Sequence, residues 1–272
     1  MIFIPDGEEK EKALARTTHM TVAAHQDDIE LTSLGVIGEC REKENHFFTG
    51  VVVTDGSSSP RTGEYAKVTN EEMIMLRAQE QMNAAKIGNY NALVMMGYTS
   101  AQIKDRENLS PQQSLAALIQ QCRPEMIFTH NPADRHDTHV AVMRCTVDAI
   151  RSLPKEFRPK RLIGCEVWRS LDWLPDQKKI LMDTGRYIHL AGDLLGVFKS
   201  QIAGGKKYDA AFVGRQCSNA TFAQSHSCDE YEYASVALDM TRLIEDDTLL
   251  IENFVKELIE EFKTEVTARV LQ

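Results

Sequence analysis

The sequence predicts an α/β fold: a Rossmann-like parallel sheet flanked by helices on both faces, with added C-terminal strands and a terminal helix. Short apolar runs, which are typical of buried strands, alternate along the chain with segments whose apolar residues recur at the helical period. Strictly alternating strands and helices imply parallel strands that are covered by helices on both sides. At 272 residues, of which 43% are hydrophobic, the chain can bury a full core.

Each predicted strand is a short apolar run that ends at polar or turn-forming residues. The strands are residues 19–24, 48–53, 92–97, 125–129 and 162–168. The helices predicted between them are residues 32–45, 70–87, 112–122 and 138–152. In the third of these helices, the apolar residues recur at the spacing of a helix that covers a sheet: Leu115, Leu118, Ile119 and Cys122.

After residue 154 the alternation becomes looser. Residues 179–183 have the pattern of a further strand and residues 190–202 that of a helix. Residues 231–239 alternate like an added strand, and residues 243–271 have the pattern of a charged amphipathic helix. The apolar face of this terminal helix is a candidate interface for a homo-oligomer.

Composition argues against several classes of partner. The formal net charge of −9 argues against nucleic acid, which requires a concentrated basic face. No apolar stretch is long enough to span a membrane, and the first residues lack the basic start and apolar core of a signal peptide. The 6 cysteines form no Cys-x-x-Cys pair. We therefore expect a cytoplasmic protein with free thiols.

The first candidate site follows the first predicted strand. The apolar run from Met20 to Ala24 stops at His25, and two adjacent carboxylates follow at Asp27 and Asp28. In a parallel sheet, ligands bind beyond the carboxyl ends of the strands. One imidazole and two carboxylates at this position could bind a divalent metal and leave one carboxylate free as a base. Alternatively, both aspartates could cap the helix that follows.

A second cluster follows the strand predicted at residues 125–129. Residues 130–139 read His-Asn-Pro-Ala-Asp-Arg-His-Asp-Thr-His, in a chain that has only 8 histidines. His136 and His139 share one face at the start of the next predicted helix, because residues three apart are neighbours on a helix. A catalytic zinc takes three protein ligands and keeps one position open. Two His/Asp clusters that each follow a strand therefore predict a metal site.

These motifs resemble those of the PIG-L/LmbE-like family of zinc-dependent N-deacetylases. Residues 24–28, Ala-His-Gln-Asp-Asp, match the first family motif, and residues 132–139 resemble the second. Between them, residues 54–56 (Thr-Asp-Gly) and the helix-forming segment 77–88 also match in order and spacing. The resemblance spans residues 18–150 and is much weaker in the last part of the chain.

The resemblance implies a role for each candidate residue. The zinc ligands would be His25, Asp28 and His139. Asp27 would be the general base for the metal-bound water, and His136 would stabilise the oxyanion or protonate the leaving amine. Arg77 would contact the substrate. This division is chemically consistent, because zinc lowers the pKa of bound water toward about 7 and a nearby carboxylate can then complete its deprotonation.

Two positions depart from the family pattern. Gln26 replaces the usual proline, which removes a backbone restraint but no chemical group. Thr138 stands where the family commonly places an aspartate that would orient the catalytic histidine. Asp134 or Asp137 could take over that role.

We therefore expect a zinc-dependent hydrolase that removes an acetyl or other acyl group from an N-acetylated amino-sugar-type small molecule. The alternatives are a zinc amidohydrolase for a non-sugar amide and a non-catalytic small-molecule binding protein on the same fold. Residues 1–272 would form a single domain, in which residues 18–154 hold the metal site and residues 155–272 supply substrate-site loops and the C-terminal helix. The roles of His130 and His226 stay open.

Overall fold

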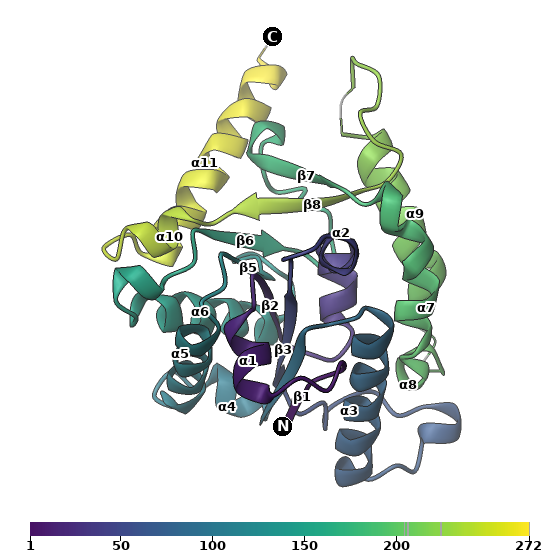
Figure 1. Cartoon of the computed structure of the whole chain (residues 1–272). Helices are drawn as coiled ribbons and strands as arrows, with labels where there is room; N and C mark the ends of the chain where they lie inside the picture. The colour runs from purple at the N-terminus through teal and green to yellow at the C-terminus, as the bar shows by residue number, and fades with distance from the viewer. Residues whose placement is uncertain (204, 206, 224, 272) are drawn as a thin grey trace.

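The computed structural model describes residues 1–203, 205, 207–223 and 225–271, and it places their strands in one eight-stranded mixed sheet (Figure 1). The strand order is β1-β4-β3-β2-β5-β6-β8-β7. The strands are β1 Ile2–Phe3, β2 His19–Ala23, β3 Phe48–Thr54, β4 Ala92–Tyr98, β5 Met126–His130, β6 Arg161–Cys165, β7 Lys179–Asp183 and β8 Ala234–Asp239.

Five strands form the parallel centre of the sheet, in the order β4-β3-β2-β5-β6. From β2 the chain moves outward through β3 to β4 and then returns to add β5 on the other side of β2. The strand order therefore reverses between β2 and β5, and in doubly wound sheets a ligand binds at the carboxyl ends of the strands at this point. The predicted Rossmann-like parallel sheet is confirmed, and the added C-terminal strand β8 pairs antiparallel with both β6 and β7.

Helices cover both faces of the sheet, as predicted (Figure 1). The helices are α1 Lys10–Ala15, α2 Asp28–Glu42, α3 Asn70–Ile87, α4 Ser100–Lys104, α5 Ser110–Cys122, α6 Asp137–Arg151, α7 Ala191–Gly196, α8 Lys199–Ala203, α9 Tyr208–Thr221, α10 Arg242–Glu245 and α11 Ile251–Val270. Short 3₁₀ turns occur at Gly63–Tyr65, Lys155–Phe157, Asp176–Lys178 and Gly185–Leu190.

The pleat of the central strands divides the core into two apolar layers. In β3, Val51 and Val53 pack toward α5 and α6, whereas Val52 packs toward α2 and α3, because successive side chains of a strand point to opposite faces. The strand is buried along its whole length, as expected for a parallel strand between two layers of helices. No helix within the described ranges is long and apolar enough to cross a membrane.

Several predicted boundaries are wrong. The helix predicted at residues 190–202 is two short helices, α7 and α8, and the helix predicted at residues 243–271 is interrupted between α10 and α11. At that interruption, Asp246 Oδ1 accepts hydrogen bonds from the backbone N–H and the hydroxyl of Thr248, at 2.9 and 2.6 Å, and these bonds favour a turn over a helix. Helix α9 was not predicted, because few large apolar residues mark a helical period in its sequence.

Candidate metal centre and active site

Four histidines and two aspartates meet at the carboxyl ends of β2 and β5. They come from the turn after β2, the last residue of β5 and the start of α6: His25, Asp27, Asp28, His130, His136 and His139. These two clusters are far apart in the sequence but lie together in space, since β2 and β5 are neighbouring parallel strands. The site therefore lies at the point where the strand order reverses.

The turn between β2 and α2 directs the two adjacent aspartates toward different partners. Asp27 has a left-handed backbone conformation with a φ of 93°. Asp28 begins α2, and its Oδ2 accepts a hydrogen bond from the backbone N–H of His25 at 2.8 Å. The side chain of Asp27 caps no N–H group of α2. Helix capping by Asp27 therefore does not explain the pair.

Three side chains present donor atoms at the spacing of a tetrahedral zinc site. His25 Nδ1 lies 3.1 Å from Asp28 Oδ2, His139 Nε2 lies 3.3 Å from the same oxygen, and the two nitrogens are 3.2 Å apart. Ligands about 2.0–2.1 Å from a tetrahedral zinc ion lie about 3.3 Å from one another. The distances among the three residues that the family resemblance implied as ligands therefore match the spacing of a tetrahedral zinc site, and His130 and His136 lie beside the same atoms.

His130 lies beside this triad but is committed to the protein. Its Nε2 lies 3.7 Å from Asp28 Oδ2, and it accepts a hydrogen bond from the backbone N–H of Ala24 at 2.9 Å. The ring is buried and stacks on His139, with centroids 3.9 Å apart. Burial and the neighbouring histidines hold the pKa of His130 well below its usual range. The ring is therefore a neutral support for His139.

Asp134 contacts two histidines of the His/Asp cluster. Its Oδ2 lies 3.2 Å from Nδ1 of His139, and its Oδ1 accepts a hydrogen bond from the backbone N–H of His136 at 2.9 Å. Although burial lowers the pKa of His139, the carboxylates of Asp28 and Asp134 raise it to about 10. A pocket that favours positive charge on His139 this strongly also suits a divalent cation. Asp137, in contrast, is exposed at the first turn of α6.

Asp27 lines the same cavity as the triad and pairs with Arg77. Arg77 Nη2 lies 3.1 Å from Asp27 Oδ2 and also donates to the carbonyl oxygen of Gln26, while Nη1 donates to Glu80 Oε2 at 2.9 Å. Arg77 is only 1% exposed. Burial and Asp28 raise the pKa of Asp27 to about 6, against the lowering effects of Arg77 and His25. Asp27 therefore has a pKa that suits a general base near neutral pH.

His136 lies at the open side of the cluster. Its Nδ1 accepts a hydrogen bond from the backbone N–H of Thr138 at 3.2 Å, which caps α6. The ring is half-buried, stacks on His139 at 4.6 Å and meets His25 edge-on at 5.0 Å. Burial and these two histidines lower the pKa of His136. A neutral ring whose Nδ1 accepts this bond carries its proton on Nε2 and can donate it to a ligand.

A cavity of about 250 Å³ opens in front of these residues. Its wall includes the loop after β3, in which Gly56 has a φ of +78° and a Cβ atom would lie 2.6 Å from Gln26 Oε1. Trp168 and Tyr208 close the other side. Tyr208 was not predicted as a site residue, because it lies outside the two His/Asp motifs and at the start of a helix that was not predicted. His226 is exposed in the segment after α9 and does not line this cavity.

Comparisons with known proteins agree with this geometry. Residues 20–150 match the PIG-L family model, described as GlcNAc-PI de-N-acetylase. The chain is 23% identical over 186 residues to the probable N-acetyl-alpha-D-glucosaminyl L-malate deacetylase 2 of Bacillus subtilis, an alignment that covers 68% of this chain and 83% of that protein. Residues 20–150, which match the family model, contain all six residues of the His/Asp cluster.

Solved structures share the fold at low sequence identity. The N,N′-diacetylchitobiose deacetylase of Pyrococcus horikoshii superposes with a TM-score of 0.65 and 14% identity, over 89% of this chain and 90% of that one. The 4-carboxy-2-hydroxymuconate hydratase of Pseudomonas putida has the same TM-score of 0.65, with 17% identity over 82% of this chain and 96% of that one. The fold therefore accommodates more than one reaction. The PIG-L family match covers residues 20–150, the region that holds the His/Asp motifs described above.

Proposed function

We propose that this protein is a zinc-dependent N-deacetylase that hydrolyses the acetamide group of a small N-acetylated amino sugar. The observation that carries the proposal is the combination of a ligand triad at zinc spacing with a separate buried carboxylate, Asp27, that is not part of the triad. A protein that only bound a small molecule would need no such base beside its metal. The activities for which the relatives are named, deacetylation of an N-acetylglucosaminyl malate and of diacetylchitobiose, support the choice of substrate class.

His25, Asp28 and His139 would hold the metal. When bound there, zinc would supply a Lewis acid for the amide carbonyl and would acidify the attacking water. Asp134, 3.2 Å from His139 Nδ1, fixes the ring so that Nε2 faces the metal position. The donor set of two imidazoles and one carboxylate with an open position is typical of catalytic zinc.

Asp27 and His136 would perform the proton and charge steps. Asp27 accepts a proton from the water as the water oxygen attacks the amide carbon. Arg77 holds the Asp27 carboxylate in place through the 3.1 Å contact. The Nε2–H of His136 donates a hydrogen bond to the carbonyl oxygen as that oxygen gains negative charge. When the carbon–nitrogen bond breaks, protonated Asp27 returns the proton to the nitrogen, and acetate and the free amine leave.

The test is acetate release by the zinc-loaded protein from a panel of N-acetylated amino sugars and their glycosides. At least one member should be deacetylated, whereas simple esters and peptides should react poorly. The His139→Ala variant should lose most of its zinc and all of this activity. Cleavage of non-sugar amides alone would favour the broader amidohydrolase function, and full zinc occupancy without activity on any member would favour a binding protein.

A further inference from the structure

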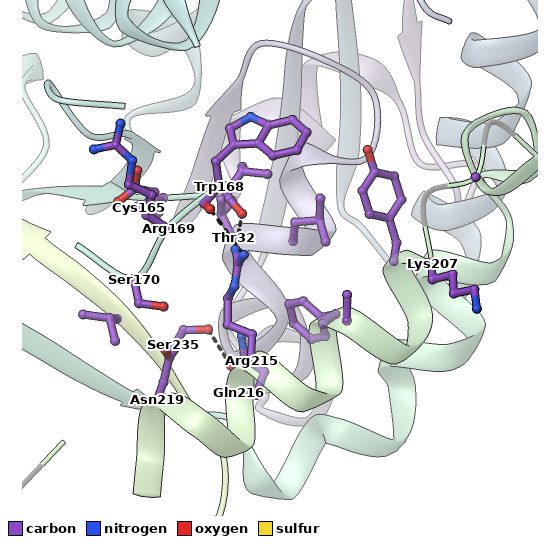
Figure 2. A pocket seen from close by; sticks show the side chains of 18 residues that line it. Thr32, Cys165, Trp168, Arg169, Ser170, Lys207, Arg215, Gln216, Asn219 and Ser235 are labelled. Carbon is purple, nitrogen blue, oxygen red and sulfur yellow. Dashed lines mark hydrogen bonds between the residues drawn. The ribbon is translucent and has the colours of Figure 1, made fainter. Parts of the chain in front are cut away.

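A second cavity adjoins the catalytic one. It has a volume of about 260 Å³ and shares Val167, Trp168 and Tyr208 with the cavity at the metal cluster (Figure 2). Its remaining walls come from α2, the segment after β6, helix α9 and strand β8. Most of this wall follows residue 154, outside the region that matches the PIG-L family model. A substrate that occupied both cavities would pass the three shared side chains.

The second cavity is rich in positive charge, although the chain as a whole carries a net charge of −9. Among the described residues that line it, three are cations, Arg169, Lys207 and Arg215, and one is acidic, Glu166. Among the side chains that the structure describes, none of the three cations lies within ion-pair distance of a carboxylate. Within the described residues, the cavity thus contains positive charge with no carboxylate at ion-pair distance.

Arg215 is the cation that projects into the cavity. In Figure 2 the Arg215 side chain extends from α9 toward Thr32 and Trp168, whereas the side chain of Lys207 extends away from these residues. Its guanidinium donates to the carbonyl oxygens of Val167 and, at 3.4 Å, Trp168. Two carbonyl acceptors position the group but leave its charge and its other N–H donors available, since a guanidinium has five. Arg215 is half-buried, so an anion bound there would be partly shielded from water.

Glu166 supplies a second polar group in the same wall. It is 8% exposed, and its Oε2 accepts a hydrogen bond from the backbone N–H of Leu171 at 3.1 Å. Its Oε1 is buried and has no hydrogen-bond partner in the described structure. A buried polar atom without a partner is costly, and a ligand group could satisfy it. Burial raises the pKa of Glu166 to about 7, so near neutral pH the protonated carboxyl can donate to an oxygen anion.

We propose that the second cavity binds an anionic group, a carboxylate or a phosphate, that is attached to the amino sugar, with Arg215 as its principal anchor. The apolar side chains of Leu31, Val167 and Phe212 would pack against the short carbon skeleton that carries the anion. This inference rests on the proposed function, because it assumes that the N-acetylated sugar occupies the catalytic cavity.

Binding and activity are measured separately to test it. The zinc-loaded Asp27→Asn protein is titrated calorimetrically with three ligands: the methyl glycoside of N-acetylglucosamine, its carboxymethyl glycoside and N-acetylglucosamine 1-phosphate. At least one acidic ligand should bind about tenfold or more tightly than the neutral one, as expected for a charge-assisted hydrogen bond. Comparison of the two acidic ligands identifies the anion. Acetate release from the same compounds is measured with the wild-type enzyme.

Two variants test the anchor. Arg215→Gln should remove most of the preference for the acidic ligand. This change also removes hydrogen bonds to two carbonyls, so Ala211→Glu provides a second test. Residue 211 is exposed on α9 and lines the cavity. The substitution adds a negative charge without touching those carbonyls and should also reduce the preference for the acidic ligand. Arg186→Gln, an exposed arginine outside this cavity, is the matched control and should retain the preference.

The outcomes separate the two proposals. Acetate release with equal affinity for acidic and neutral glycosides would overturn the second site and leave the deacetylase function intact. Tight, Arg215-dependent binding of an acidic ligand without acetate release from any compound would overturn the deacetylase function and retain the anion site. Failure of all three ligands to bind would overturn the second site, and the deacetylase function would then be decided by acetate release from the wider panel of N-acetylated amino sugars.

Discussion

Substitution of Asp134 by Asn should weaken zinc binding even though Asp134 is not itself a ligand. The carboxylate serves two partners with two different oxygens: Oδ2 lies 3.2 Å from His139 Nδ1, and Oδ1 accepts the backbone N–H of His136 at 2.9 Å. An asparagine has only one oxygen, so its amide N–H₂ group would face one of these two donors. The negative charge that favours His139 as a ligand is also lost.

Loss of such a supporting carboxylate typically costs about 10- to 100-fold in metal affinity, which corresponds to about 1.4–2.7 kcal/mol. We expect the Asp134→Asn protein to show a zinc Kd raised by this factor when it competes with a chromophoric chelator. The control is Asp137→Asn, because Asp137 is exposed in the first turn of α6 and its side chain has no hydrogen bond or ion pair with the cluster among the described residues. Equal zinc affinities in the two variants would refute the assignment of Asp134 as the residue that orients His139.

Three further substitutions test other parts of the site. Arg77→Lys should lower kcat more than tenfold with zinc retained, because an ammonium cannot reproduce the planar fork that reaches Asp27 and Glu80; an effect on KM alone would instead make Arg77 a direct substrate contact. Gly56→Ala should lower the free energy of unfolding by about 1–3 kcal/mol in chemical denaturation, given the positive φ and the close approach to Gln26; wild-type stability would contradict the tight turn. Because the folded-state pKa of Glu166 is raised from 4.5 to about 7, its carboxyl lowers stability as pH rises from about 4.5 to about 7. The free energy of unfolding of Glu166→Gln should therefore exceed that of wild type by about 1–2 kcal/mol at pH 8, after allowance for solvent screening, and by little at pH 4.5.

The sequence alone predicted the parallel centre of the fold and the meeting of the two His/Asp segments. Both depend on local signals: apolar runs that end in polar residues, and His/Asp motifs placed directly after them. Since parallel strands end at one edge of a sheet, His25 and His139 could be expected to meet although they are far apart in the chain. The structure adds the distances between the donor atoms, which match the spacing of a tetrahedral zinc site.

The sequence could not reveal features that depend on long-range packing. Helix α9 carries Tyr208 and Arg215 but contains few large apolar residues such as Phe212, and it was not predicted. Whether Asp134 or Asp137 would orient His136 was undecided from the sequence. The structure places buried Asp134 beside His139 Nδ1 and the backbone N–H of His136, whereas Asp137 is exposed. His130 looked equivalent to the other histidines until its hydrogen bond with the N–H of Ala24 was seen.

The most direct test of the account is a comparison of Asp27→Asn with Asp28→Asn, in which zinc content and acetate release are both measured. Asp28 Oδ2 lies within 3.3 Å of both histidine donors, whereas Asp27 faces Arg77. The account predicts that Asp27→Asn retains its zinc and loses about 10²- to 10⁴-fold in rate, as expected when a positioned base is removed, and that Asp28→Asn loses its zinc. Equal zinc loss in both variants, or full activity in Asp27→Asn, would contradict it.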